Sequence, residues 1–236
     1  MRTWVNRLLQ NEQAGLLLAL ILLCVVLSFL SPVFFTALNI KNVLRDAALV
    51  AIAGIGMVMV ILLGEIDLSV GSVQAVAGIV AVAVLNSFSS VFVALGAALF
   101  TGACIGLING LLITRAHINS LIATLGMMAI LRGGAMVSTQ AVSIQGSVDS
   151  FIEIGTGHWG PIPIPVLIAF LLLALFFYVL HYTTFGRYVY AVGGNPQAAR
   201  LSGLPVDRIR IVVFVIAGIL AALSAFILAS RLNSGQ

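Results

Sequence analysis

Two acidic side chains, Glu65 and Asp67, stand in the short segment GEIDLSVGS over residues 64–72, between two apolar stretches. A charge at membrane depth costs on the order of 3 kcal/mol on insertion scales, so its presence there points to a function. The other polar or flexible positions of the segment are Gly64, Ser69, Gly71 and Ser72. Such a mixture suits a discontinuous helix whose free backbone groups line a cavity. Two interpretations stay open: the segment lines a cavity, or it forms a tight cytoplasmic turn with both acids in water.

A stripe of glycines occupies a later apolar stretch. Gly102, Gly106 and Gly110 recur every four residues. This small-xxx-small pattern lets two helix backbones approach closely, so it predicts a packed contact between helices. Asn109 stands beside the stripe, where its amide can hydrogen-bond across helices.

Thr124 and Arg132 are polar positions in the next apolar stretch. Arg132 lies some twelve residues into it, which is about 18 Å along a helix. Its guanidinium has three possible environments. It can snorkel to the membrane surface, pair with an acid such as Asp149 or Glu153, or face a polar path.

The motifs of common enzyme chemistry are absent from the sequence. It has no Walker A sequence, no H-E-x-x-H, no G-x-S-x-G and no Cys-x-x-Cys. Cys24 and Cys104 both lie in apolar runs, where a free thiol behaves as a small hydrophobe. We therefore expect no enzyme activity, no cofactor, no metal site and no disulfide. ATP hydrolysis would have to come from another protein.

The polar segment 181–210 carries four of the eleven Lys and Arg residues. Within it, Asn195 is a strong N-cap residue, Pro196 suits the first helical position and Gly203 suits the position after the C-cap. These signals predict that NPQAARLSG forms a helix of about two turns. Its apolar side would be formed by Ala198, Ala199 and Leu201. A helix this short is marginal alone, so we expect a protein partner to pack on it, in preference to lipid headgroups.

The composition shows which elements must position these residues. The chain has 236 residues, of which 61% are hydrophobic and 8% charged, whereas soluble domains carry roughly 25% charged residues. About seven stretches approach the roughly 20 apolar residues that a spanning helix needs. They are 14–31, 47–63, 71–86, 91–113, 120–138, 164–180 and 210–230, and the third is short enough for a half-helix. The sequence thus predicts an all-α, polytopic membrane protein with one transmembrane domain over 1–236.

Basic residues predict the orientation of these spans, because cytoplasmic loops are rich in Lys and Arg. Arg2 and Arg7 place the N-terminus inside, before an uncleaved first span. The loop 138–163 lacks Lys and Arg and suits the outer side, with a short surface helix around Val148–Ile154. The segment 181–210 then falls on the cytoplasmic side. In this setting the net charge of +4 gives no reason to expect nucleic acid as a partner.

Four motifs make the chain resemble the ribose, xylose and arabinose type of sugar permease, the membrane subunit of bacterial ATP-binding cassette importers. They are GEIDLSVGS at 64–72, GLINGLLI at 106–113, LIATLGMMAILRG at 121–133 and TTFGRYVYAVGGNPQAARLSGLPVDRIR at 183–210. The resemblance covers nearly all of the chain. Glu65 departs from it, because that family usually has a second glycine there.

The resemblance implies an assembly in the bacterial inner membrane. Two permeases, identical or paralogous, would pair around a path, with a cytoplasmic ATPase dimer below and a periplasmic sugar-binding protein above. The segment 181–210 would hold the coupling helix, which moves with the ATPases and shifts the path between its two openings. The coupling positions are Gly194, Asn195, Ala198, Ala199, Ser202 and Gly203. The expected path or helix-break positions are Gly64, Glu65, Asp67, Ser69, Gly71, Asn109 and Thr124.

The resemblance also leads us to expect a C-terminal truncation, because the family continues beyond the position of Arg231 with about three further spans. Two other functions remain as alternatives. One is a proton-coupled secondary transporter that uses Glu65 or Asp67, and the other is a non-transporting remnant.

Overall fold

The computed structural model describes residues 12–235, and the chain divides into two units between Leu44 and Arg45. The predicted orientation signals Arg2 and Arg7 lie outside the described residues. The first unit contains α2 (Glu12–Leu30) and the first residues of α3 (Ala37–Leu62). Most large apolar side chains of α2 are exposed, as is usual for a helix that faces lipid.

Long apolar helices make up most of the second unit. After the remainder of α3 come α4 (Val70–Phe88), α5 (Val91–Thr114), α6 (Ser120–Thr139), α8 (Ile164–Tyr182) and α11 (Val206–Leu232). Six helices of the described chain, α3, α4, α5, α6, α8 and α11, are long and apolar enough to cross a membrane, and Ala14–Leu30 is a shorter apolar helix. The predicted all-α, polytopic fold with about seven spans is confirmed. The third predicted span is a helix of 19 residues, longer than the expected half-helix.

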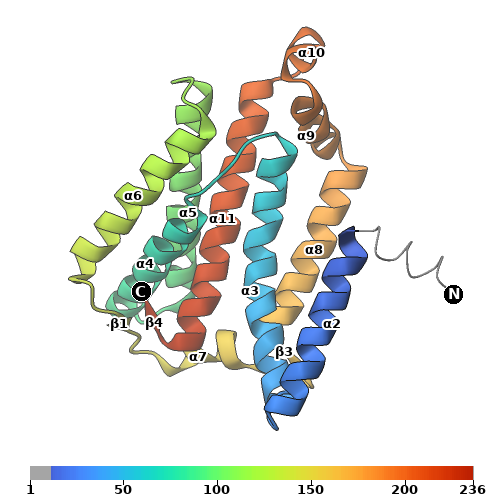
Figure 1. The fold of residues 1–236 in the computed structure, drawn as a ribbon. Helices are drawn as coiled ribbons and strands as arrows, with labels where there is room; N and C mark the ends of the chain where they lie inside the picture. Colours follow the sequence, from blue (N-terminus) through green and yellow to red (C-terminus); the bar gives the residue numbers. More distant parts are fainter. Residues whose placement is uncertain (1–11, 236) are drawn as a thin grey trace, which may run out of the picture. The chain divides into compact units, whose positions relative to one another are not determined.

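Short elements connect these helices at the two ends of the second unit. Helices α9 (Thr184–Gly194) and α10 (Pro196–Leu201) lie at one end, and α7 (Asp149–Thr156) lies at the other (Figure 1). The helix expected around Val148–Ile154 is thus confirmed as α7. Strand β1 (Ile144–Gln145) pairs antiparallel with β4 (Ser234–Gly235). Strand β2 (His158–Trp159) pairs in the same way with β3 (Ile162–Pro163).

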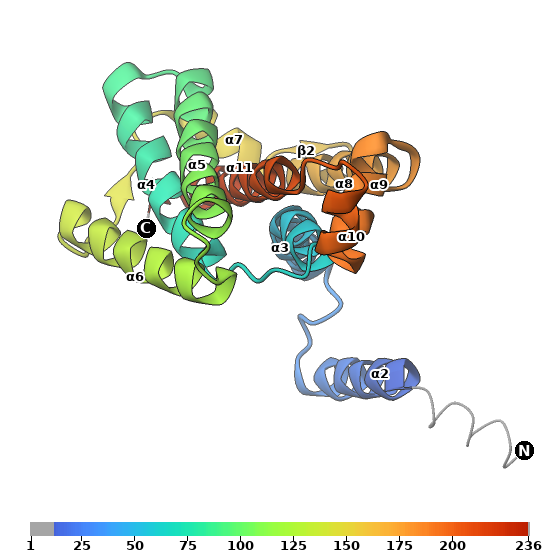
Figure 2. The ribbon, with the colours of Figure 1, turned by 90° about the horizontal axis from the view of Figure 1, so that it is seen from above.

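Helix α11 is the central element of the second unit, with α5 on one side and α3 on the other (Figure 2). The glycine stripe of α5 packs directly on its backbone. A Cβ added at Gly102 or Gly106 would collide with the carbonyl oxygen of Gly218 or Phe214, and one at Gly110 would lie 2.9 Å from the Cα of Ile211. The predicted close contact between helices is confirmed, and α11 is the partner.

Candidate functional site

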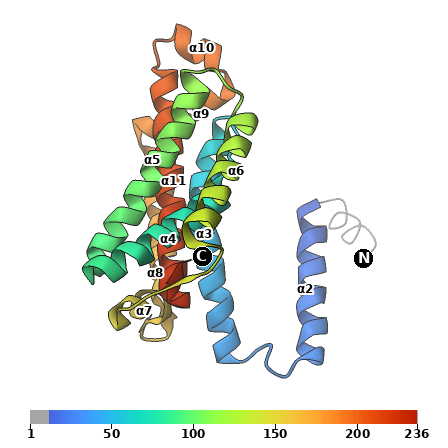
Figure 3. The ribbon, with the colours of Figure 1, turned by 90° about the vertical axis from the view of Figure 1, so that its left-hand side faces the viewer.

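Residues 63–69, here called the extended segment, leave α3 through a turn at 63–64 and continue without helical structure over 65–69. The chain returns toward the middle of the bundle before α4 begins (Figures 1 and 3). Side chains of α6 satisfy its backbone. The N–H of Ile66 donates to the Ser120 hydroxyl at 3.3 Å, and the N–H of Leu68 donates to the Thr124 hydroxyl at 3.2 Å. A non-helical backbone inside a membrane domain needs such partners. The predicted polar position Thr124 therefore holds the extended segment.

A buried polar cluster lies at the end of this segment. The Oδ1 atom of Asp67 accepts hydrogen bonds from the Ser69 N–H at 2.8 Å and the Ser69 hydroxyl at 2.6 Å. The Asn109 amide donates to the Ser69 hydroxyl at 3.0 Å. Asp67 is only 5% exposed and Asn109 only 1%. The interpretation as a turn with both acids in water is therefore wrong for Asp67.

Glu65 lies at the start of the same segment and pairs with an arginine of α11. Its carboxylate lies 3.1 Å from the guanidinium of Arg210, and the two side chains are 12% and 19% exposed. The carboxylate that departs from the sugar permease pattern thus has a cationic partner 145 positions further along the chain. The sequence predicted that Arg210 belongs to the cytoplasmic segment 181–210 and gave no sign of this contact.

Two cavities adjoin α4 beyond the extended segment. Gly71 and Gln74 line one of about 160 Å³, and Gln74 also lines one of about 470 Å³ with Ser224 and Asp46. The Gln74 amide donates to the Ser224 hydroxyl at 3.1 Å. Sequence reasoning included Gly71 but missed Gln74 and Ser224. Their signal was a polar side chain within a mostly apolar span.

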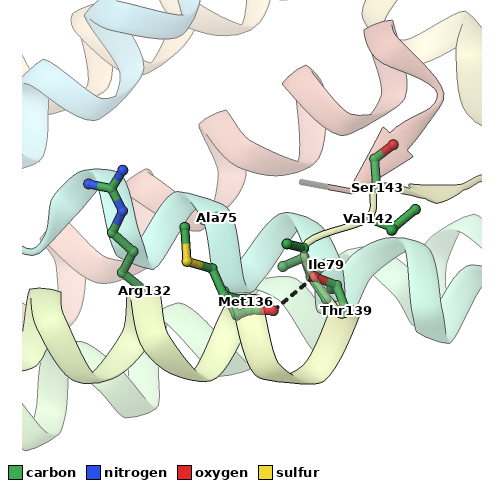
Figure 4. Close-up of a pocket in the computed structure, with 9 residues that line it drawn as sticks. Ala75, Ile79, Arg132, Met136, Thr139, Val142 and Ser143 are labelled. Carbon is green, nitrogen blue, oxygen red and sulfur yellow. Dashed lines mark hydrogen bonds between the residues drawn. The ribbon is translucent and has the colours of Figure 1, made fainter.

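Arg132 lies beside a third cavity, of about 410 Å³, between α4 and α6. Figure 4 shows Arg132 and Met136 extending from the same side of α6, with the Thr139 hydroxyl donating to the Ala135 carbonyl at 3.0 Å. The three ion pairs found in the described part of the chain do not include Arg132. Pairing with Asp149 or Glu153 is therefore absent there, and Arg132 is an exposed residue that lines this cavity.

Helix α10 has both predicted caps. The Asn195 side chain accepts hydrogen bonds from the N–H groups of Gln197 and Ala198, both at 3.0 Å. Gly203 has φ +80°, and its N–H donates to the Arg200 carbonyl at 3.0 Å while the N–H of Leu204 donates to Ala199 at 3.0 Å. These two bonds are the Schellman motif that ends many helices. The helix and its caps are confirmed, although it has only 6 residues.

The expected apolar side of α10 is wrong in one respect. Ala199 is 5% exposed and packs in an apolar cluster with Val192 and Val206, whereas Leu201 is 91% exposed. Residues two positions apart point about 200° apart on a helix, so Ala199 and Leu201 cannot share a face. The other predicted coupling positions are exposed, namely Gly194, Asn195, Ala198, Ser202 and Gly203. Leu201 is thus the large apolar side chain that α10 exposes, and it was not among the predicted coupling positions.

These helices define a multi-pass membrane protein with a non-helical segment between α3 and α4 and a capped helix at one end. Residues 39–236 match the family described as "Branched-chain amino acid transport system / permease component". The chain belongs to this family of membrane permeases.

Curated relatives cover nearly the whole chain. It is 40% identical over 223 residues to the ribose import permease protein of Haemophilus influenzae, and the aligned residues cover 93% of this chain and 69% of that protein. The Escherichia coli ribose import permease protein is 41% identical over 224 residues, with 93% and 70% covered. The L-arabinose ABC transporter permease protein of Azospirillum brasilense is 37% identical over 225 residues, with 95% and 66% covered. No solved structure matches the chain. The predicted resemblance to sugar permeases is confirmed.

Proposed function

We propose that this chain is the membrane permease subunit of an ATP-binding cassette importer for a monosaccharide of the pentose or hexose type. The relatives named for ribose import and L-arabinose transport support the substrate class. The structural observation that most supports this proposal is α10, a helix capped at both ends whose Leu201 side chain is exposed. The chain would transport without enzyme activity of its own.

Helix α10 would be the coupling helix within residues 181–210 and would dock on a cytoplasmic ATPase dimer. An apolar side chain that is 91% exposed at the end of a bundle suits insertion into a pocket of a partner protein. The arginines near this end support a cytoplasmic position for it, and Arg2 and Arg7 of the sequence support the same side of the inner membrane for the N-terminus. The opposite end, with α7, would then receive the sugar-binding protein.

The translocation path would run beside the extended segment 63–69 within a single permease domain, paired with a second permease subunit. Its polar groups are the buried cluster around Asp67 and Asn109 and the α4 positions Gly71 and Gln74, which line a cavity. Unwound backbone near the middle of a span is typical of transporter binding sites. A neutral sugar would meet hydroxyl and amide groups there.

Affinity purification tests the docking surface. The tagged chain, expressed in the organism that encodes it, should retain a protein with a Walker A sequence and ATPase activity. Leu201→Asp should lower the retained ATPase by about tenfold or more, because a hot-spot residue at the centre of an interface contributes about 2 kcal/mol or more and the aspartate would bring a charge into the apolar contact.

The matched control is Ile162→Asp, which places the same charge on an exposed residue in β3 at the opposite end of the second unit. It should leave ATPase capture unchanged. The absence of any ATPase with the parent chain would reject the importer. Sugar uptake that follows the proton gradient and survives ATP depletion would instead support a secondary transporter.

A further inference from the structure

We propose that the ion pair between Glu65 and Arg210 transmits movement of α10 to the extended segment 63–69. The two side chains would act as positioning residues for transport. This inference rests on the proposed function, because it assumes that α10 is the helix on which the ATPase acts.

Helix α10 is joined to the first turns of α11. The Arg200 guanidinium lies 2.6 Å from the Asp207 carboxylate, and the N–H of Val206 donates to the Leu204 carbonyl at 2.9 Å. Ala199 of α10 packs in the same buried cluster as Val206 of α11. The Arg200–Asp207 pair is exposed and contributes little, so the buried packing shared by Ala199 and Val206 should carry a displacement of α10 to the beginning of α11.

Arg210 stands in the second turn of α11 and carries that displacement to Glu65. The two side chains are 19% and 12% exposed, respectively, so the pair is largely withdrawn from solvent. An ion pair in such a position resists separation, because each charge would otherwise lose its partner where water reaches it poorly. The Glu65 carboxylate should therefore follow the Arg210 guanidinium.

A second contact joins Leu62 and Leu63, at the start of the extended segment, to helix α9, which precedes α10. Gly193 of α9 lies against the backbone of Leu62, and a Cβ there would collide with the Leu62 carbonyl oxygen. Leu63, which is 2% exposed, shares an apolar cluster with Val189 and Val192 of α9. The start of the extended segment is thus held by elements on both sides of α10.

The extended segment leads directly from Glu65 to the buried polar cluster. Hydroxyl groups of α6 accept hydrogen bonds from the backbone of Ile66 and Leu68, and the Asp67 carboxylate accepts one from the Ser69 N–H. These are side-chain hydrogen bonds of single residues with no continuous ladder, so a shift at Glu65 can rearrange them individually. The ion pair, the packing of α9 on Leu62 and Leu63, and a short length of backbone thus connect the region of α10 to the proposed path.

The test compares transport with ATP hydrolysis in the complete importer. Variants are introduced at the chromosomal locus, the tagged chain is purified with its bound subunits and reconstituted, and radiolabelled ribose and L-arabinose are the probes. Glu65→Gln and Arg210→Gln should each lower uptake about tenfold while ATP hydrolysis stays within about twofold of the parent, so that more ATP is used per sugar. The exchanged double variant, Glu65→Arg with Arg210→Glu, should recover most of the uptake.

Arg210→Lys, which keeps the charge, should transport like the parent and shows whether position 210 tolerates substitution. The matched control is Arg115→Gln, which removes an exposed arginine at the end of α5, and it should leave the ratio of ATP to sugar unchanged. Unaltered uptake in Glu65→Gln, or parallel losses of uptake and hydrolysis without recovery in the exchanged variant, would overturn the inference. A parent complex that hydrolyses ATP but moves neither sugar would instead count against the proposed substrate class.

Discussion

Replacing Gly106 by leucine should eliminate most of the folded protein. A Cβ at this position would lie 2.9 Å from the Cα of Val215 and collide with the carbonyl group of Phe214. These are backbone atoms, so α5 and α11 would have to separate. Overpacking of a core typically costs about 1–3 kcal/mol, and a whole leucine side chain against a rigid backbone should reach at least the upper end of this range. Thermal unfolding in detergent, followed by size-exclusion chromatography, measures the loss.

Gly96→Leu is the matched control in the same helix. A Cβ at Gly96 meets no atom within 4 Å, and leucine is a better helix former than glycine by roughly 0.5–1 kcal/mol. This variant should be as stable as the parent or slightly more stable. Equal stability of the Gly106 and Gly96 variants would show that the glycine stripe is not required for the contact with α11.

The sequence predicted features that depend on local spacing. The four-residue glycine period indicated a close contact because each glycine exposes its own backbone, whatever lies opposite. The caps of α10 were predictable because Asn195 and Gly203 act within a few residues of themselves. The helix that packs on the glycine stripe could not be predicted in this way. Nothing in the spacing of Gly102, Gly106 and Gly110 identified α11, whose contact residues lie about a hundred positions later.

The environment of the extended segment could not be predicted from its own residues. GEIDLSVGS indicated a break in the helix, but its environment depends on side chains from three other helices. Glu65 pairs with Arg210 of α11, Leu68 with Thr124 of α6, and Ser69 with Asn109 of α5. The local sequence alone does not determine whether such a segment is buried or exposed to solvent. These distant partners decide between them.

Replacing Asp67 by alanine should abolish most sugar uptake and also destabilise the protein. The Ser69 N–H and hydroxyl would both lose their acceptor, at a position where Ser69 has no exposed surface. An unsatisfied buried donor costs about 1–3 kcal/mol, so the start of α4 should rearrange. Uptake of radiolabelled ribose, normalised to the amount of chain in the membrane, should fall about tenfold or more.

Asp67→Asn separates hydrogen bonding from charge at the same site. The asparagine keeps the side-chain oxygen that accepts both bonds from Ser69, and it has nearly the same shape. If Asp67 acts by fixing the backbone, this variant should retain uptake and stability close to those of the parent, as should Asp149→Ala, which removes an exposed acid in α7. If Asp67→Asn instead folds normally but loses uptake, the negative charge itself is required. The buried carboxylate would then carry a proton or a cation, and the sugar would not move by ATP-driven coupling through α10 alone.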